Sequence, residues 1–90
     1  MAKPHHRSNF IGVSKNGNNW QALVVIDNIK VYLGTYKTQK EAATIFDFHS
    51  IVVHYMWAKV NFDYTASDVI RMIQIFKENG NEFAAKMFFL

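Results

Sequence analysis

The sequence predicts an α+β fold, in which a three-stranded antiparallel sheet packs on one long helix and a C-terminal helical extension follows. Two observations support this prediction. Turn-forming residues at 15–19 and at 27–28 separate three short segments of alternating apolar and polar residues, as in an antiparallel meander. Helix-start signals then follow at Thr38 and again at Thr65.

The three strands are expected at 10–13, 20–26 and 29–36. The turn between the first two contains the pair Asn16-Gly17, which favours a tight hairpin. Successive side chains of a strand point to opposite faces, so each strand has a core face and an outer face. The expected core face carries Trp20, Ala22, Val24, Ile26, Val31 and Leu33, and the outer face carries Gln21, Leu23, Val25, Lys30 and Tyr32.

Two helices should follow the sheet. Thr38 and Glu41 have the spacing of a capping box, which places the first helix start near Gln39. This helix carries more apolar side chains than one sheet face needs, Ile45 and Phe48 among them. The second helix should run from Thr65 to Gly80, with an apolar stripe formed by Val69, Ile73 and Phe76. The last segment, 82–90, can form two further turns.

The length and composition predict one small domain. The chain has 90 residues, half of them hydrophobic, and no cysteine, which excludes a disulfide framework and thiolate metal sites. Its apolar runs are too short to span a membrane, and its start lacks an apolar signal segment, so we expect a soluble intracellular protein. We divide the chain into a flexible basic arm (1–9), a sheet-and-helix domain (10–64) and a helical extension (65–90).

Charge is distributed unevenly along the chain. Residues 1–40 carry a net charge of +5, whereas residues 41–90 carry −2. A positive sheet on a slightly acidic helical half is a plausible electrostatic footprint for nucleic acid. The alternative is that these lysines are solvated charges that only keep the protein soluble.

The segment 10–62 resembles the DNA-binding domain of the APETALA/ethylene-responsive-factor family, in a divergent version of the kind found outside plants. The resemblance rests on several short motifs in the family's order and spacing. They are Phe10-x-Gly12-Val13, Trp20-x-Ala22, Tyr32-Leu33-Gly34-Thr35-Tyr36, Thr38-x-x-Glu41-Ala42-Ala43 with Phe46-Asp47, and Ala58-x-x-Asn61-Phe62. The closing run Asn61-Phe62-Asp63-Tyr64-Thr65 is similar to protist or phage-related versions.

This resemblance implies that the outer sheet face enters the major groove of double-stranded DNA, and that the protein is nuclear. Plant members place arginine or glutamate where this chain has Ile11, Ser14, Leu23 and Val25, so the resemblance implies weak or relaxed sequence specificity. The candidate DNA-contacting residues are Arg7, Ser14, Lys15, Asn16, Asn19, Gln21, Lys30, Tyr32, Thr35 and Lys37. For the asparagines, turn formation is an alternative role.

A second hypothesis is an interaction subunit of a larger assembly that keeps the fold and has lost DNA binding. Outward apolar residues and the apolar tail would then bind a protein partner. The candidate partner-binding residues are Leu23, Val25, Phe76, Met87, Phe88 and Phe89. The alternative for the tail is that it folds back over the first helix and completes the core.

We expect no catalysis, no small-molecule substrate, no cofactor and no metal site. Asp47 and Asp63 have no histidine or nucleophile at a useful spacing, and Asp47 should instead accept hydrogen bonds from backbone N–H groups. His49 and His54 are five residues apart, so on a helix they face different directions.

Overall fold

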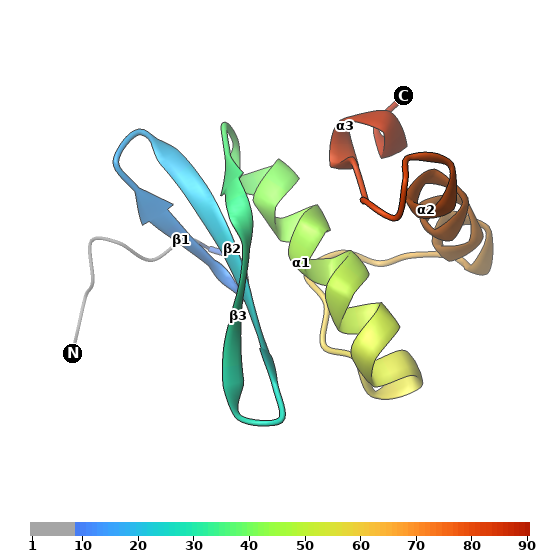
Figure 1. The fold of residues 1–90 in the computed structure, drawn as a ribbon, viewed down its shortest axis with the longest axis horizontal. Helices are drawn as coiled ribbons and strands as arrows, with labels where there is room; N and C mark the ends of the chain where they lie inside the picture. The colour runs from blue at the N-terminus through green and yellow to red at the C-terminus, as the bar shows by residue number, and fades with distance from the viewer. Residues whose placement is uncertain (1–8) are drawn as a thin grey trace.

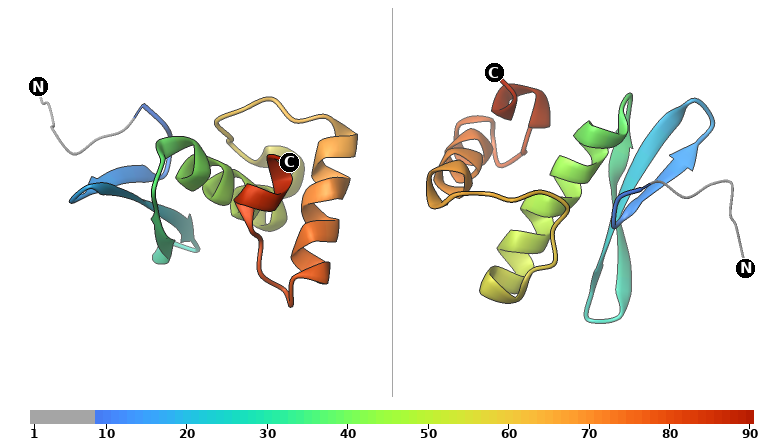
Figure 2. Two further views of the ribbon diagram at one scale, coloured as in Figure 1. Left: turned by 90° about the horizontal axis from the view of Figure 1, so that it is seen from above. Right: turned by 180° about the vertical axis from the view of Figure 1, so that it is seen from behind.

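The computed structural model describes residues 9–90, which form three layers (Figures 1 and 2). The elements are β1 (Val13–Asn16), β2 (Asn19–Ile26), β3 (Ile29–Tyr36), α1 (Gln39–His54), a 3-10 turn (Tyr55–Trp57), α2 (Ala66–Glu78) and α3 (Ala85–Phe88). The sheet covers one side of α1, while α2 and α3 cover the other. The expected α+β architecture is confirmed. The basic arm, except for Asn9, lies outside the described residues.

The strands form one antiparallel sheet in the order β1-β2-β3, as predicted. The first strand begins at Val13 and not at Phe10, so its predicted position was wrong. Residues 10–12 instead form a turn in which the Val13 N–H donates to the Phe10 carbonyl at 3.4 Å. The β1-β2 loop consists of Gly17 and Asn18, because Asn16 already pairs with Asn19.

The third strand contains a bulge at the tripeptide Leu33-Gly34-Thr35. Ala22 pairs with Gly34 and Leu23 pairs with Tyr32, so Leu33 has no partner across the ladder. The bulge shifts the alternation by one residue and places Tyr32 and Thr35 on the same, outer face. At Gly34 a side chain would meet the Tyr36 hydroxyl at 2.7 Å, and that hydroxyl donates to the Leu33 carbonyl at 2.9 Å.

Helix α1 begins at Gln39 as predicted, and the Thr38 hydroxyl accepts a hydrogen bond from the Glu41 N–H at 3.1 Å. The helix is buried on both sides, since the sheet packs on one side and the C-terminal helices pack on the other. This sandwich explains its surplus of apolar side chains: Ile45 and Phe48 belong to the same core as Ala22 and Val24 of the sheet.

The C-terminal part folds back over α1, which was the alternative that the sequence left open for the tail. Phe83 stacks on Phe48 with a ring-centroid distance of 4.5 Å and an interplanar angle of 16°. Arg71 of α2 donates hydrogen bonds to the carbonyls of Met87, at 2.9 Å, and of Phe88.

The predicted apolar stripe of α2 needs one correction. Its buried residues are Met72 and Ile75, and Ile73 is exposed. The helix is therefore rotated relative to the predicted orientation. The start of α2 is as predicted, with a complete capping box between Thr65 and Asp68.

Candidate nucleic-acid interface

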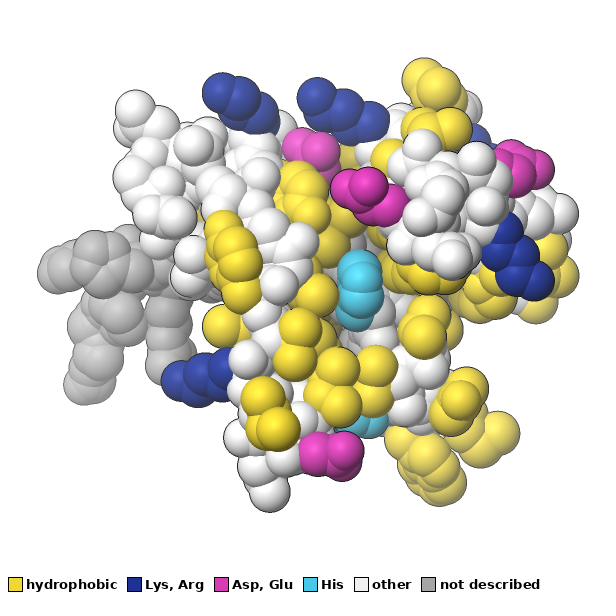
Figure 3. All heavy atoms as spheres, viewed as in Figure 1, with side chains coloured by type: hydrophobic (Ala, Val, Ile, Leu, Met, Phe, Trp, Pro, Cys, Tyr) yellow, Lys and Arg dark blue, Asp and Glu magenta, His cyan; other side chains and the backbone are white. Residues whose placement is uncertain are grey.

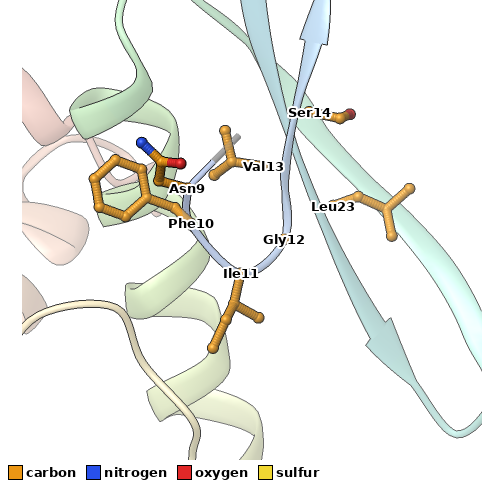
Figure 4. A pocket seen from close by; sticks show the side chains of 7 residues that line it. All are labelled: Asn9, Phe10, Ile11, Gly12, Val13, Ser14 and Leu23. Carbon is orange, nitrogen blue, oxygen red and sulfur yellow. The ribbon is translucent and has the colours of Figure 1, made fainter. Parts of the chain in front are cut away.

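The face of the sheet that points away from α1 is the candidate interface. In Figure 4, Ser14 of β1 and Leu23 of β2 project from this face, whereas Val13 points back toward the helix. At Leu23 the sheet changes from three strands to two. The Leu23 N–H donates a hydrogen bond to the Gly12 carbonyl at 2.8 Å, and from there to the β2-β3 loop only β2 and β3 continue. The outer face thus consists of a three-stranded end and a two-stranded end.

Most of the predicted DNA-contacting residues lie on this face. By the pairing register they are Ser14, Asn16, Asn19, Gln21, Lys30, Tyr32 and Thr35. Two contacts hold their side chains in place. Asn16 Nδ2 donates to Gln21 Oε1 at 3.4 Å, and the hydroxyls of Tyr32 and Thr35 are hydrogen-bonded to each other across the bulge.

Of the remaining three predicted residues, Lys15 and Lys37 do not lie on this face. Lys15 was expected on the outer face, but it shares the inner pleat of β1 with Val13, and its ammonium lies 5.8 Å from the ring centre of Trp20. Because Lys15 is exposed at the end of the sheet, it still borders the interface. Lys37 follows β3 and lines a small hollow with Asn19 and Glu41. Arg7 lies outside the described residues.

The six predicted partner-binding residues do not form one surface. Leu23 and Val25 lie on the outer sheet face, opposite Tyr32 and Lys30 of β3. Phe76 and Phe88 are partly buried and contact Phe48 and Phe83, respectively. Met87 and Phe89 are exposed, and the Phe89 ring lies 4.9 Å from the Lys40 ammonium.

A hydrogen-bond network behind the interface fixes the start of β1. The Asn61 side chain accepts from the Ile11 N–H at 2.7 Å and donates to the Ile11 carbonyl at 3.1 Å. Asn61 also donates from its side chain and its backbone to Asp47 Oδ1, both at 2.9 Å. The network thereby ties the segment before β1 to the middle of α1. The sequence motif contains Asn61, but its bridging role was not predicted.

Asp47 accepts two more hydrogen bonds, from the Phe62 N–H at 3.2 Å and from the Tyr64 hydroxyl at 2.7 Å. Its predicted role as a structural acceptor is confirmed. Burial raises the pKa of the Asp47 carboxyl, and the hydrogen bonds that it accepts act in the opposite direction. Burial and the neighbouring Asp47 also raise the pKa of the Tyr64 phenol, which therefore remains a donor.

Beside Phe10 and Ile11 the surface forms a hollow of about 510 Å³, which Ser14 and Leu23 line on the outer side of the sheet (Figure 4). The ring of Phe10 lies 5.3 Å from that of Phe62. The hollow is continuous with the outer face through Ser14 and Leu23. A ligand on the sheet would therefore also reach the turn that precedes β1.

A second exposed surface lies at the end of α1 and was not predicted. Tyr55, Met56 and Trp57 are 76%, 85% and 83% exposed, and Figure 3 shows hydrophobic side chains projecting at the lower right, beyond the end of α1. Next to them, α1 and α2 border an apolar groove of about 420 Å³ lined by Val52, Tyr55, Ile73 and Phe76, among others. The sequence signal was a run of large apolar residues just after the helix.

Residues 9–90 were also compared with the requirements of a metal site and of a membrane-spanning helix. In this range no three histidine or acidic side chains come close enough to hold a metal ion. The helices found there are too short or too polar to cross a membrane.

Together, the fold and the open face define a class of small domain in which one helix supports a three-stranded sheet and leaves its other face free. Three relatives with similar sequences are plant proteins. An AP2-like ethylene-responsive transcription factor of Arabidopsis thaliana is 42% identical over 60 residues, which cover 62% of this chain and 17% of that protein. The AP2-like ethylene-responsive transcription factor CRL5 of Oryza sativa subsp. japonica is 37% identical over 70 residues, 73% of this chain and 11% of the relative. The ethylene-responsive transcription factor ERN3 of Medicago truncatula is 35% identical over 65 residues, 69% of this chain and 27% of the relative.

No protein-family model matches the chain. The segment that contains the sheet and α1 is nevertheless similar in sequence to AP2/ERF transcription factors, and its architecture is consistent with a domain of that type. The chain spans between 11% and 27% of the length of these three relatives.

Proposed function

We propose that this chain binds double-stranded DNA by placing the outer face of its sheet in the major groove. The observation that supports this most directly is the open outer face, which carries the Asn16-Gln21 pair and Thr35 toward one end of the sheet and Tyr32 and Lys30 toward the other. The similarity to plant transcription factors supports the same function.

The dimensions of the hairpin fit this role. Neighbouring strands are about 4.8 Å apart, and a two-stranded antiparallel ribbon fits a major groove that is about 12 Å wide. The β2-β3 hairpin forms such a ribbon where it extends past the start of β1 at Val13 (Figure 1). With α1 behind it, the hairpin can enter the groove without a change in the core.

The binding is weak and of relaxed specificity, because cations are few. Lys30 is the one cation on the outer face of the described strands, with Lys15 and Lys37 at its border. Phosphate contacts by such cations supply most of the affinity but no sequence information. A module of this kind serves as an accessory subunit of a DNA-acting or transcription-related complex, with a nuclear location and no enzymatic activity of its own.

The test is a fluorescence-anisotropy titration of a labelled duplex with the full chain. Lys30→Ala should weaken binding by about three- to tenfold, because it removes one phosphate contact from the interface. Lys77→Ala, on the far side of α1, removes the same charge and should leave the affinity within twofold. Equal effects of the two substitutions would show that net charge, and not the sheet, determines binding.

The surface formed by Tyr55, Met56 and Trp57 favours a second function, binding of a protein partner. Three consecutive large apolar side chains that stand free in solvent are typical of an interaction site. This function is compatible with the first, since the exposed run follows the end of α1 and the predicted DNA-contacting side chains lie on the outer face of the sheet.

Co-purification from the native source can separate the two functions. A partner held by this surface should be lost when Met56 and Trp57 are replaced by alanine and retained in Lys30→Ala. The reverse pattern, loss in Lys30→Ala alone, would assign the partner to the sheet or to the DNA.

A further inference from the structure

The outer face of the sheet changes its chemistry along β2. Near the β1-β2 loop it presents two carboxamides, Asn16 and Gln21, in mutual contact at 3.4 Å. Toward the β2-β3 loop it presents two aliphatic side chains, Leu23 and Val25. The outer face therefore has an amide end, formed by Asn16 of β1 and Gln21 of β2, and an aliphatic end, formed by Leu23 and Val25 of β2.

The amide end matches adenine and the aliphatic end matches thymine, the two bases of an A·T pair. A glutamine or asparagine amide can donate to adenine N7 and accept from its N6 amino group, and an aliphatic side chain can pack on the thymine methyl group. Both edges are accessible in the major groove, where A·T pairs differ from G·C pairs.

The groups that read G·C pairs are scarce on this face. Arginine or lysine reads guanine, and acidic side chains accept from cytosine; of these groups the outer face of the described strands carries only Lys30. Strands β1, β2 and β3 contain neither arginine nor any acidic residue. Arg71, the arginine among the described residues, lies on α2 and binds the carbonyls of Met87 and Phe88.

We propose that the sheet selects A·T-rich DNA through thymine methyl groups packed against Leu23 and Val25, with Gln21 bound to adenine. This inference rests on the proposed DNA binding and specifies its target. The spacing is suitable: alternate residues of a strand are about 7 Å apart, close to two base-pair steps of 3.4 Å. The three side chains therefore sample a stretch of about five base pairs.

Tyr32 and Lys30 complete the aliphatic end. They pair across the hairpin with Leu23 and Val25, respectively, so the apolar strip has an aromatic ring and a cation beside it. The hydrogen bond between the Tyr32 and Thr35 hydroxyls keeps the Tyr32 ring along the strand. Lys30 is then free to reach a phosphate at the groove wall.

The test compares matched duplexes in an anisotropy titration with the full chain. An A·T-rich duplex should bind more tightly than a G·C-rich duplex of equal length. Replacing thymine by deoxyuridine at the site removes only methyl groups, and it should weaken binding by about fourfold for each methyl group that the protein contacts. Replacing cytosine by 5-methylcytosine in the G·C-rich duplex should regain part of the affinity.

Two variants assign the effect to the sheet. Val25→Ala should weaken binding to the thymine duplex and reduce the response to deoxyuridine. Val52→Ala, the same substitution at a similarly exposed position on α1, should leave both unchanged; the exposures are 48% and 47%. Both side chains are half-exposed, so the fold should persist, which a thermal melt can verify.

Each result leads to a distinct conclusion. Binding to both duplexes with equal affinity, and with no response to deoxyuridine, would overturn the thymine-methyl inference and leave the proposed DNA binding intact. No binding to any duplex at low salt would overturn the proposed function and this inference together. A deoxyuridine response that persists in Val25→Ala and Leu23→Ala would place the methyl contacts elsewhere.

Discussion

Gly12 sits where backbone and side-chain packing both exclude other residues. Its φ is 77°, in the left-handed region, and a Cβ atom there would lie 2.1 Å from Cδ1 of Phe46. The turn before β1 therefore rests directly on the ring of a buried helix residue. This close approach places the carbonyl that pairs with Leu23 at the start of the interface.

We predict that Gly12→Ala lowers the free energy of unfolding by about 3 kcal/mol or more, through backbone strain and the clash with Phe46. Gly17→Ala is the matched control, because Gly17 has a φ of 63° and no atom within 4 Å of its Cβ position. It should cost only about 1 kcal/mol. Urea unfolding measures both, and equal costs would contradict the packing role of Gly12.

The Asp47 carboxylate should be equally sensitive to substitution. Asp47→Asn keeps the size but replaces one acceptor oxygen by a donor that faces the N–H and O–H groups of Phe62 and Tyr64. We expect the free energy of unfolding at pH 7 to fall by about 2–4 kcal/mol. Tyr64→Phe removes one of these donors and should cost about 1–2 kcal/mol. A loss below 0.5 kcal/mol in Asp47→Asn would show that the network is not a stabilising one.

At the level of single residues, the sequence supports some roles better than others. An aspartate inside an apolar helix has to be satisfied when buried, so the role of Asp47 as an acceptor is predictable. The bridging by Asn61 is not, since it depends on how the loop after α1 returns to the start of β1. Lys15 was expected in the turn after the first strand, but β1 extends to Asn16, and the alternation along β1 gives Lys15 the same inner face as Val13.

At the level of elements, the C-terminal extension covers the apolar side of α1 that the sheet leaves free. Phe83 stacks on Phe48, and Met72, Ile75 and Ala85 join the same core. The extension therefore helps to stabilise the helix that supports the sheet. This packing could be foreseen only as an alternative, because a nine-residue apolar tail is equally suited to a partner.

Phe83→Ala should lower the free energy of unfolding by about 3–5 kcal/mol, since it removes a buried ring from the core. Phe89→Ala, in the same tail but exposed, should cost less than about 1 kcal/mol. Thermal or urea unfolding followed by circular dichroism gives both values. If the two substitutions cost the same, the tail does not contribute to the core in the way the structure shows.

The strands and helices themselves are largely predictable from short-range signals. The turn residues at 27–28 and the caps at Thr38 and Thr65 set four boundaries correctly. The bulge after Tyr32 and the rotation of α2 were not predictable, because they depend on contacts between distant parts of the chain. The order of the family motifs provided the topology that local patterns alone do not determine.

At the scale of the whole molecule, the sheet and the helical side have different properties. The sheet carries Lys15, Lys30 and an open outer face, whereas α1 and α2 border an apolar groove, and the exposed run Tyr55, Met56 and Trp57 follows the end of α1. Such a division suits a module that contacts DNA with one side and a protein with the other. The sequence predicted the DNA side from motifs, while the groove appears only when α2 is placed against α1.

The most direct test of the central claim is the salt dependence of DNA binding by the full chain. With three to five phosphate contacts, the logarithm of the association constant should fall against the logarithm of salt concentration with a slope of about −3 to −4.5. Lys30→Ala should reduce that slope by about 1, and Lys77→Ala should not change it. No binding at low salt, or a slope that Lys77→Ala changes as much as Lys30→Ala does, would contradict DNA binding by the outer face of the sheet.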